Sequence, residues 1–149
     1  MITATGLLRD LIALMGRDHL TVEDVTARVG PVIADPGQPV PLRLDATPTG
    51  VASATLARDP QSGGPMSLEL RLAESAGLRL DALEQLLGAY TEARSDREMP
   101  RRFVFAPAPS DTDWHVTVIA QVPRGAALEQ SAVASVTLRR DPGRVRQRS

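Results

Sequence analysis

The sequence predicts an α+β domain with an antiparallel sheet of five to six strands and helices packed on one face. The expected order of elements is α-α-β-β-β-α-β-β-β. Two observations predict this class: apolar residues recur at helical spacing near the N-terminus, and from Val40 onward they alternate with polar residues. The length of 149 residues suits one domain with a buried core. We therefore expect a single domain over residues 1–140, followed by a basic, flexible tail over 141–149.

Two helices are expected first. The first has apolar residues three and four positions apart, which share one helix face: Leu7, Leu8, Leu11, Ile12, Leu14 and Met15. Gly16 is suited to end this helix. Thr21 is suited to cap a short second helix that runs to Val29 and stops at Gly30 and Pro31.

Three strands and a third helix follow. A hairpin is expected over 40–46 and 51–58, and the alternation is most regular over 66–72. Asp81 is suited to cap a helix over 81–90, because its apolar stripe continues from Leu83 to Tyr90.

The last part of the chain predicts two or three strands. Strands are expected over 101–106 and 113–122; in the second, Trp114 and the residues two apart from it point inward. Residues 125–130 favour a helical turn, whereas the β-branched residues between 133 and 137 favour a strand over 132–139.

This order of elements is similar to that of type III secretion chaperones, which are small acidic α+β proteins that commonly form homodimers and hold extended client segments. The resemblance lies in the order of elements and includes no sequence motif. It implies a protein or peptide partner and a homodimer, and the basic tail departs from the pattern of that family.

The composition excludes several kinds of chemistry. The chain has no lysine, cysteine or asparagine and only two histidines, His19 and His115. A Schiff base, a thiolate nucleophile, a thiolate metal site and a three-histidine zinc site are therefore excluded. A GC-rich genome explains the loss of lysine and asparagine together, so the reliance on arginine is weak evidence for function. We expect no cofactor and no metal.

Charge and hydropathy indicate where such a chain functions. The formal net charge is −1, but five of the seventeen arginines lie in residues 139–149. No apolar run is long enough to span a membrane, and the N-terminus lacks the basic start of a signal peptide. We expect a cytoplasmic protein without a membrane partner.

Specific nucleic-acid binding is not expected, because prolines crowd residues 31–41, where the recognition helix of a helix-turn-helix would lie.

One group of side chains is a candidate for catalysis. Asp113, His115 and Thr117 are two residues apart on one strand, so they share a face, and Asp113 could orient His115 as a general base.

A second group is a candidate for binding. If the polar strand face is left uncovered by helices, it could receive a peptide or an acidic ligand. The residues expected there are Arg43, Glu69, Arg71, His115 and Thr117.

Two functions therefore remain. The favoured one is a non-enzymatic binding or adaptor protein, related in role to chaperones, that engages a protein or peptide partner through its sheet face or an apolar strip. The alternative is a small cofactor-independent isomerase or cyclase, in which His115 and Asp113 transfer a proton in an apolar cavity.

Overall fold

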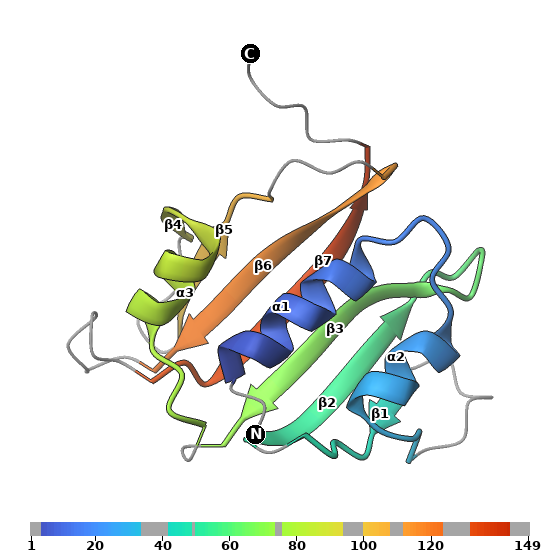
Figure 1. Ribbon diagram of the computed structural model, residues 1–149, viewed down its shortest axis with the longest axis horizontal. Coiled ribbons are helices and arrows are strands. Elements are labelled where there is room, and N and C mark those ends of the chain that lie inside the picture. The colour runs from blue at the N-terminus through green and yellow to red at the C-terminus, as the bar shows by residue number, and fades with distance from the viewer. Residues whose placement is uncertain are drawn as a thin grey trace.

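Seven antiparallel strands form one sheet in the computed structural model of the protein, with the strand order β1-β2-β3-β7-β6-β5-β4 (Figure 1). The structure describes residues 4–33, 42–48, 50–73, 76–93, 100–107, 112–123 and 132–143. The helices are α1 (Ala4–Met15), α2 (Val22–Val29) and α3 (Leu80–Leu87). The strands are β1 (Leu42–Leu44), β2 (Val51–Arg58), β3 (Pro65–Leu72), β4 (Tyr90–Ala93), β5 (Arg101–Phe105), β6 (Trp114–Val122) and β7 (Ser135–Pro142).

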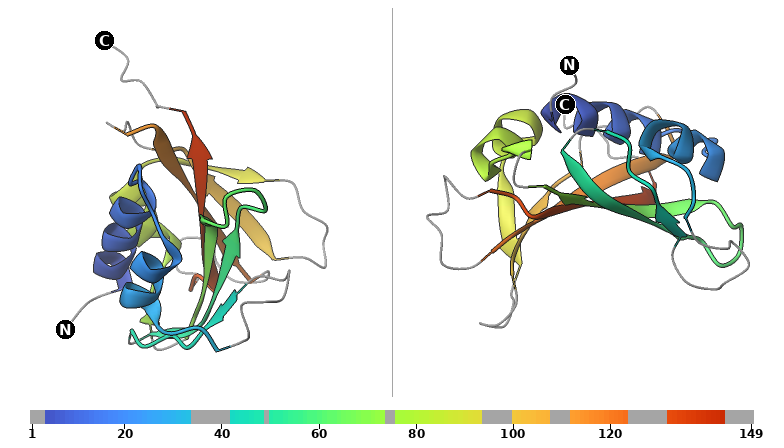
Figure 2. Two further views of the ribbon diagram at one scale, coloured as in Figure 1. Left: turned by 90° about the vertical axis from the view of Figure 1, so that its right-hand side faces the viewer. Right: turned by 90° about the horizontal axis from the view of Figure 1, so that it is seen from below.

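The three helices lie on the same side of the sheet (Figure 2). Helix α1 contacts the central strands β6 and β7, and it also packs against α2 and α3. The side of the sheet that faces the helices is apolar. One row crosses all seven strands in register: Leu42, Leu56, Leu68, Leu138, Val118, Phe105 and Tyr90. The alternation of apolar and polar residues thus places one face of β1, β2, β3, β5, β6 and β7 in the core, whereas β4 contributes the half-buried Tyr90.

The antiparallel α+β class is confirmed, but the expectation of five to six strands is wrong because the sheet has seven. The additional strand is β4, whose first residue, Tyr90, was expected to be the end of the third helix. Helix α3 ends at Gly88, whose φ of 93° is left-handed and suits glycine. Tyr90 therefore begins a strand, and its ring packs edge-on against Phe103 at 5.1 Å between ring centres.

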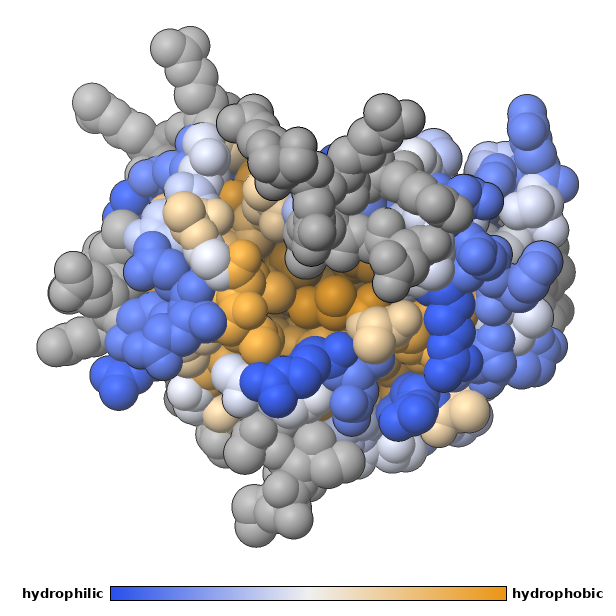
Figure 3. All heavy atoms as spheres, turned by 45° about the horizontal axis from the view of Figure 1, so that its top comes forward, coloured by the Kyte–Doolittle hydropathy of each residue, from blue (hydrophilic) through white to orange (hydrophobic). Residues whose placement is uncertain are grey.

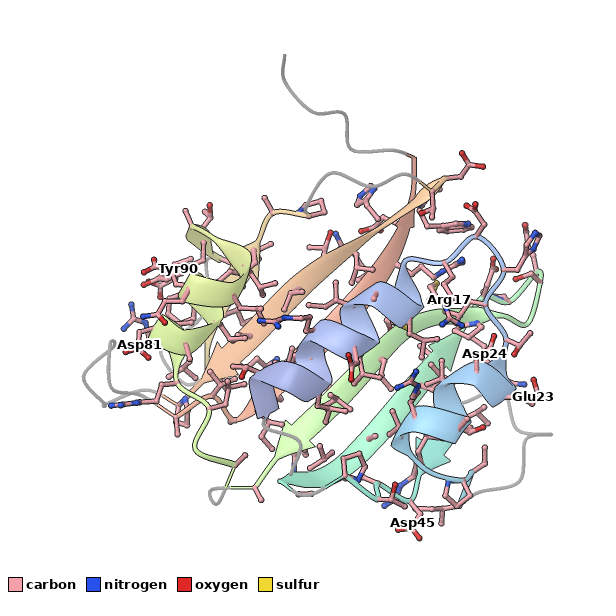
Figure 4. The ribbon with its side chains drawn as sticks, in the orientation of Figure 1. Arg17, Glu23, Asp24, Asp45, Asp81 and Tyr90 are labelled. Carbon is pink, nitrogen blue, oxygen red and sulfur yellow. The ribbon has the colours of Figure 1, made fainter. Side chains whose placement is uncertain are left out.

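The ends of the helices test the expected caps. Thr21 is the N-cap of α2, as predicted: its hydroxyl accepts a hydrogen bond from the Asp24 amide at 3.2 Å, and the Asp24 carboxylate accepts one from the Thr21 amide at 3.1 Å. Arg79, not Asp81, is the N-cap of α3, and no side chain caps it. Asp81 lies in the first turn of α3 (Figure 4).

The final segment is a strand, as the β-branched residues predicted. Strand β7 starts at Ser135 and runs to Pro142, so Asp141 and Pro142 belong to the sheet. Residues 125–130, for which a helical turn was considered, and residues 144–149 of the basic tail lie outside the described residues.

The helix layer leaves part of its own side of the sheet accessible. Figure 3 shows apolar side chains gathered in a hollow on this side, bordered in part by hydrophilic side chains. Exposed large hydrophobic side chains in the described part of the chain are Ile33 and Met66, which are 61% and 42% exposed.

No helix in the described ranges is long and apolar enough to cross a membrane.

Candidate functional site: the open face of the sheet

The side of the sheet opposite the helices is formed by the alternate residues of every strand, and we call it the open face. Figure 2 shows no helix on this side among the residues that the structure describes. The strand registers assign the following residues to it: Arg43, Ser53, Thr55, Ala57, Ser67, Glu69, Arg71, Thr91, Ala93, Arg102, Val104, His115, Thr117, Ile119, Gln121, Ser135, Thr137, Arg139 and Asp141. Seven of these are serine or threonine, whose short side chains donate and accept hydrogen bonds.

Exposed arginines lie among the short side chains of the open face. Arg43, Arg71, Arg102 and Arg139 are exposed, whereas the acidic residues of the open face are the half-buried Glu69 and Asp141. The open face thus carries a positive charge, although the whole chain has a formal net charge of −1.

All five residues predicted for binding lie on the open face, but they are spread over three strands. Arg43 on β1 and Glu69 on β3 are both in register with Thr55 on β2, which lies between them. Two strand spacings of about 4.8 Å separate the backbones of Arg43 and Glu69. Arg71 lies in the adjacent row of the same face, opposite Ser135.

The two predicted residues of β6 form a cluster around Asp141 at one end of the open face. The Thr117 hydroxyl donates to Asp141 Oδ2 at 3.1 Å, and Arg139 Nε donates to the same oxygen at 3.0 Å. His115 is opposite Asp141 in the register, and its Nε2 lies 3.9 Å from Oδ2. Because three side chains share one carboxylate, Asp141 holds this end of the sheet together.

The predicted partner of His115, Asp113, lies before the start of β6. The amide of Asp113 donates to Asp18 Oδ1 at 2.8 Å, and its carbonyl accepts from the Gly143 amide at 2.7 Å. His115 Nδ1 lies 2.6 Å from the carbonyl oxygen of Gly143. The ring contacts described for His115 therefore join it to the C-terminal end of β7.

On the helix side of the sheet, strand β7 carries a buried arginine, Arg140. Arg140 is 8% exposed, and its Nε donates to the carbonyl of Met15, the last residue of α1, at 2.8 Å. The terminal nitrogen donates to the carbonyls of Arg17 and Asp18, the latter at 3.2 Å. Burial lowers the pKa of Arg140 from its ordinary value and nearby Asp18 acts in the opposite direction, but a guanidinium remains charged at neutral pH.

Several of these residues were missed by the sequence analysis. Asp141 was expected at the start of the tail, because Asp141, Pro142 and Gly143 together resemble a turn, and Arg140 lies just after the last strand that was expected. Continuing the alternation of β7 by one pair of residues would have placed Asp141 on the same side as Arg139. Arg102 was assigned to a strand but was not recognised as a neighbour of Gln121, because that pairing is set by the register of two strands far apart in sequence.

Comparisons of the chain with protein-family models, with curated proteins and with solved structures each find no match. Among the described residues, no group of three histidine and acidic side chains is arranged to hold a metal ion. The function is therefore argued from the geometry of the open face.

Proposed function

We propose that the protein is a non-enzymatic binding protein that holds an extended, acidic peptide segment of a partner on the open face of its sheet. One observation carries this proposal. Four arginines and two acidic residues project from a face that no described helix covers, in a chain whose formal net charge is −1. Complementary charge favours an acidic ligand and guides its orientation.

The spacing of the arginines suits an extended segment. Arg71 and Arg102 lie in one row, separated by Ser135 and Gln121. Three strand spacings correspond to about 14 Å. In an extended peptide, residues i and i+4 lie on the same side and are also about 14 Å apart. Two acidic residues with this separation match the two guanidinium groups.

The short residues between the arginines allow a peptide backbone to approach the sheet closely. Thr117 and Ser135 are 5% and 6% exposed, so they lie low between longer neighbours. Gln121 and Thr137 are half-buried and supply donors and acceptors beside them. A segment laid across Gln121 and Thr137 exchanges hydrogen bonds with water for hydrogen bonds with the sheet, and the arginines supply the net attraction.

Nucleic acid, the other polyanion, is less suited to this face. Trp114, Tyr90, Phe103 and Phe105 are all the aromatic residues of the chain, and the registers place them on the helix side. Bases therefore have no aromatic ring on the open face to stack against. The isomerase or cyclase alternative is also less favoured, because His115 lies on the open face and contacts Gly143 and Asp141 instead of lining an apolar cavity.

A charge-matched pair of variants tests the proposal. The probe is a dye-labelled peptide of about eight residues in which threonine and aspartate alternate. Its anisotropy is measured with the wild type, with the double variant Arg71→Glu/Arg102→Glu and with the double variant Arg9→Glu/Arg28→Glu. Arg9 and Arg28 are exposed residues of α1 and α2, so both double variants change the net charge equally.

We expect the open-face variant to weaken binding by about tenfold at an ionic strength of about 50 mM, and the helix variant by less than about twofold. The same peptide with asparagine in place of aspartate should not bind. Equal losses in the two double variants would mean that only net charge attracts the peptide, and the proposal would be wrong. A single-stranded oligonucleotide that displaced the peptide and bound more tightly would also overturn it.

A further inference from the structure

A cleft of about 430 Å³ lies on the helix side, away from the open face. It is formed by the loop between α1 and α2, the hairpin between β2 and β3, and the strands β6 and β7. The side chains that matter here are Asp18, His19, Asp59, Met66, Trp114 and Arg140. A volume of this size accommodates a small molecule or one long side chain.

One wall of the cleft is apolar and aromatic. Met66 is 42% exposed, and it lies beside the cleft together with Leu20 and Pro65. Trp114 forms part of the same wall and is held in place by Arg140, whose guanidinium carbon lies 3.9 Å from its ring centre. An exposed methionine beside a fixed aromatic ring is a surface suited to an aliphatic stem.

Two other residues that line the cleft are acidic. Asp59 Oδ1 accepts one hydrogen bond, from the Gln61 amide at 2.9 Å, and Asp18 Oδ1 accepts one from the Asp113 amide at 2.8 Å. A carboxylate has capacity for about four hydrogen bonds, so both can accept more. Glu23 and Asp24 in the first turn of α2 add further negative charge beside the loop that forms the cleft (Figure 4).

The positive charge of Arg140 is offset in part by Asp18 and in part by backbone carbonyls, which leaves the charge of Asp59 uncompensated by it. The Arg140 nitrogens donate to three backbone carbonyls at and beyond the C-terminus of α1, where the helix dipole is negative. The guanidinium is also the most deeply buried charge of the cleft, since Arg140 is 8% exposed. An incoming group therefore meets the two carboxylates and the apolar wall.

We propose that this cleft binds an organic cation, namely a guanidinium or alkylammonium group on a short aliphatic stem. The carboxylates of Asp18 and Asp59 bind the charged head, since a planar guanidinium can donate to two acceptors at once. The stem lies along Met66 and Trp114. Such a cation comes from an arginine or lysine side chain of a protein, or from a free small amine. This inference is independent of the acidic ligand proposed for the open face.

Trp114 gives the inference a direct readout, because it is the only tryptophan of the chain. Its fluorescence is followed while the full-length protein is titrated with N-acetyl-arginine methylamide. The control ligand is the citrulline analogue, which has the same shape and no charge. We expect a saturable change with a dissociation constant on the order of 1 mM for the arginine ligand and at least about tenfold weaker binding of the citrulline ligand.

Matched variants assign the binding to the cleft. Asp59→Asn keeps the oxygen that accepts from Gln61 but removes the charge, and we expect it to weaken binding by about fivefold or more. Asp81→Asn removes an equal charge from the first turn of α3, away from the cleft, and should leave binding unchanged. Circular dichroism checks that both variants fold.

Titrations with butylguanidine and with a short arginine peptide distinguish the two possible sources of the cation, a free small amine and a protein side chain. Tighter binding of the peptide by about tenfold would indicate a protein ligand, and equal binding would indicate a free amine. The inference is overturned if no saturable change occurs, if the citrulline analogue binds as well as the arginine ligand, or if Asp59→Asn and Asp81→Asn behave alike.

Discussion

The guanidinium carbon of Arg140 lies 3.9 Å from the centre of the Trp114 ring, and the nitrogens of the same group donate to the carbonyl of Met15, the last residue of α1, and to two carbonyls just beyond it. One side chain thereby joins the end of β7, the start of β6 and the C-terminus of the longest helix. These elements are far apart in sequence, since Arg140 and Met15 are 125 positions apart. Arg140 therefore makes tertiary contacts that attach α1 to the sheet.

We expect Arg140→Met to lower the free energy of unfolding by about 2–4 kcal/mol, because three carbonyls lose a charged donor and Trp114 loses its cation. Methionine has a similar stem, so the change isolates the guanidinium group. Urea unfolding followed by far-ultraviolet circular dichroism measures the loss. The matched control is Arg139→Met, which removes an exposed arginine of the same strand and should cost less than about 1 kcal/mol. Similar losses in both variants would contradict the role of Arg140.

Leu138 tests which face of β7 is buried. It lies at the centre of the apolar row, between Leu68 and Val118, and is 0% exposed. Leu138→Ala should lower the free energy of unfolding by about 2–5 kcal/mol through lost contacts and a cavity. Thr137→Ala, one position earlier on the open face, should change it by less than about 1 kcal/mol. The reverse order of the two effects would show that the faces are assigned the wrong way round.

The capping box of α2 predicts a dependence of stability on pH. The hydrogen bond from the Thr21 amide lowers the pKa of Asp24 below its ordinary value of 3.8, and its hydroxyl and nearby Arg17 act in the same direction (Figure 4). Because the pKa is lower in the folded protein, the charged carboxylate stabilises the fold above pH 3.8. This contribution is lost as the pH falls through the folded pKa.

We therefore expect Asp24→Asn to be less stable than the wild type at neutral pH and the difference to shrink as the pH falls below about 4. Urea midpoints of both proteins across this range measure it. Asp45→Asn, an exposed carboxylate outside the helix, is the control. A difference between Asp24→Asn and the wild type that stayed constant with pH would show that the charge of Asp24 is not involved.

Much of the sheet could be predicted because the alternation of β2, β3 and β6 is a local property of the chain. A strand in a half-buried sheet needs an apolar residue at every second position, and those strands have one. The same rule placed Trp114 inward and His115 outward, as observed. Strand β4 was missed for a physical reason. Tyr90 lies seven positions after Leu83, which suits a helix stripe, and only the backbone at Gly88 ends the helix earlier.

The candidate site could be predicted only in part, because it depends on which strands are neighbours. Alternation put Arg71 and His115 on a polar face. It could not show that β7 lies between β3 and β6, nor that Arg139 and Asp141 therefore join Thr117 in one cluster. Likewise, the pairing of Trp114 with Arg140 across the ends of two strands follows from the register of β6 and β7 and not from any short motif.

Substitutions of Asp141 and Glu69 distinguish effects on stability from effects on peptide binding at the open face. Both are acidic residues of a face that we propose to hold an acidic peptide, so removing either charge should strengthen binding. Asp141 also accepts hydrogen bonds from Thr117 and Arg139, and Thr117 is 5% exposed, so its hydroxyl would be left without this acceptor. Glu69 is half-buried on β3, opposite Thr137.

We expect Asp141→Ala to bind the acidic peptide about threefold more tightly at low salt while losing about 1–2 kcal/mol of stability. Glu69→Gln should show the same gain in affinity with a change in stability of less than about 0.5 kcal/mol. Anisotropy titrations and urea unfolding of both variants measure the two quantities, and the gains should disappear as salt is raised. Weaker peptide binding by Glu69→Gln would show that an acidic ligand is the wrong choice for this face, because a carboxylate that contributes to binding requires a basic group on the partner.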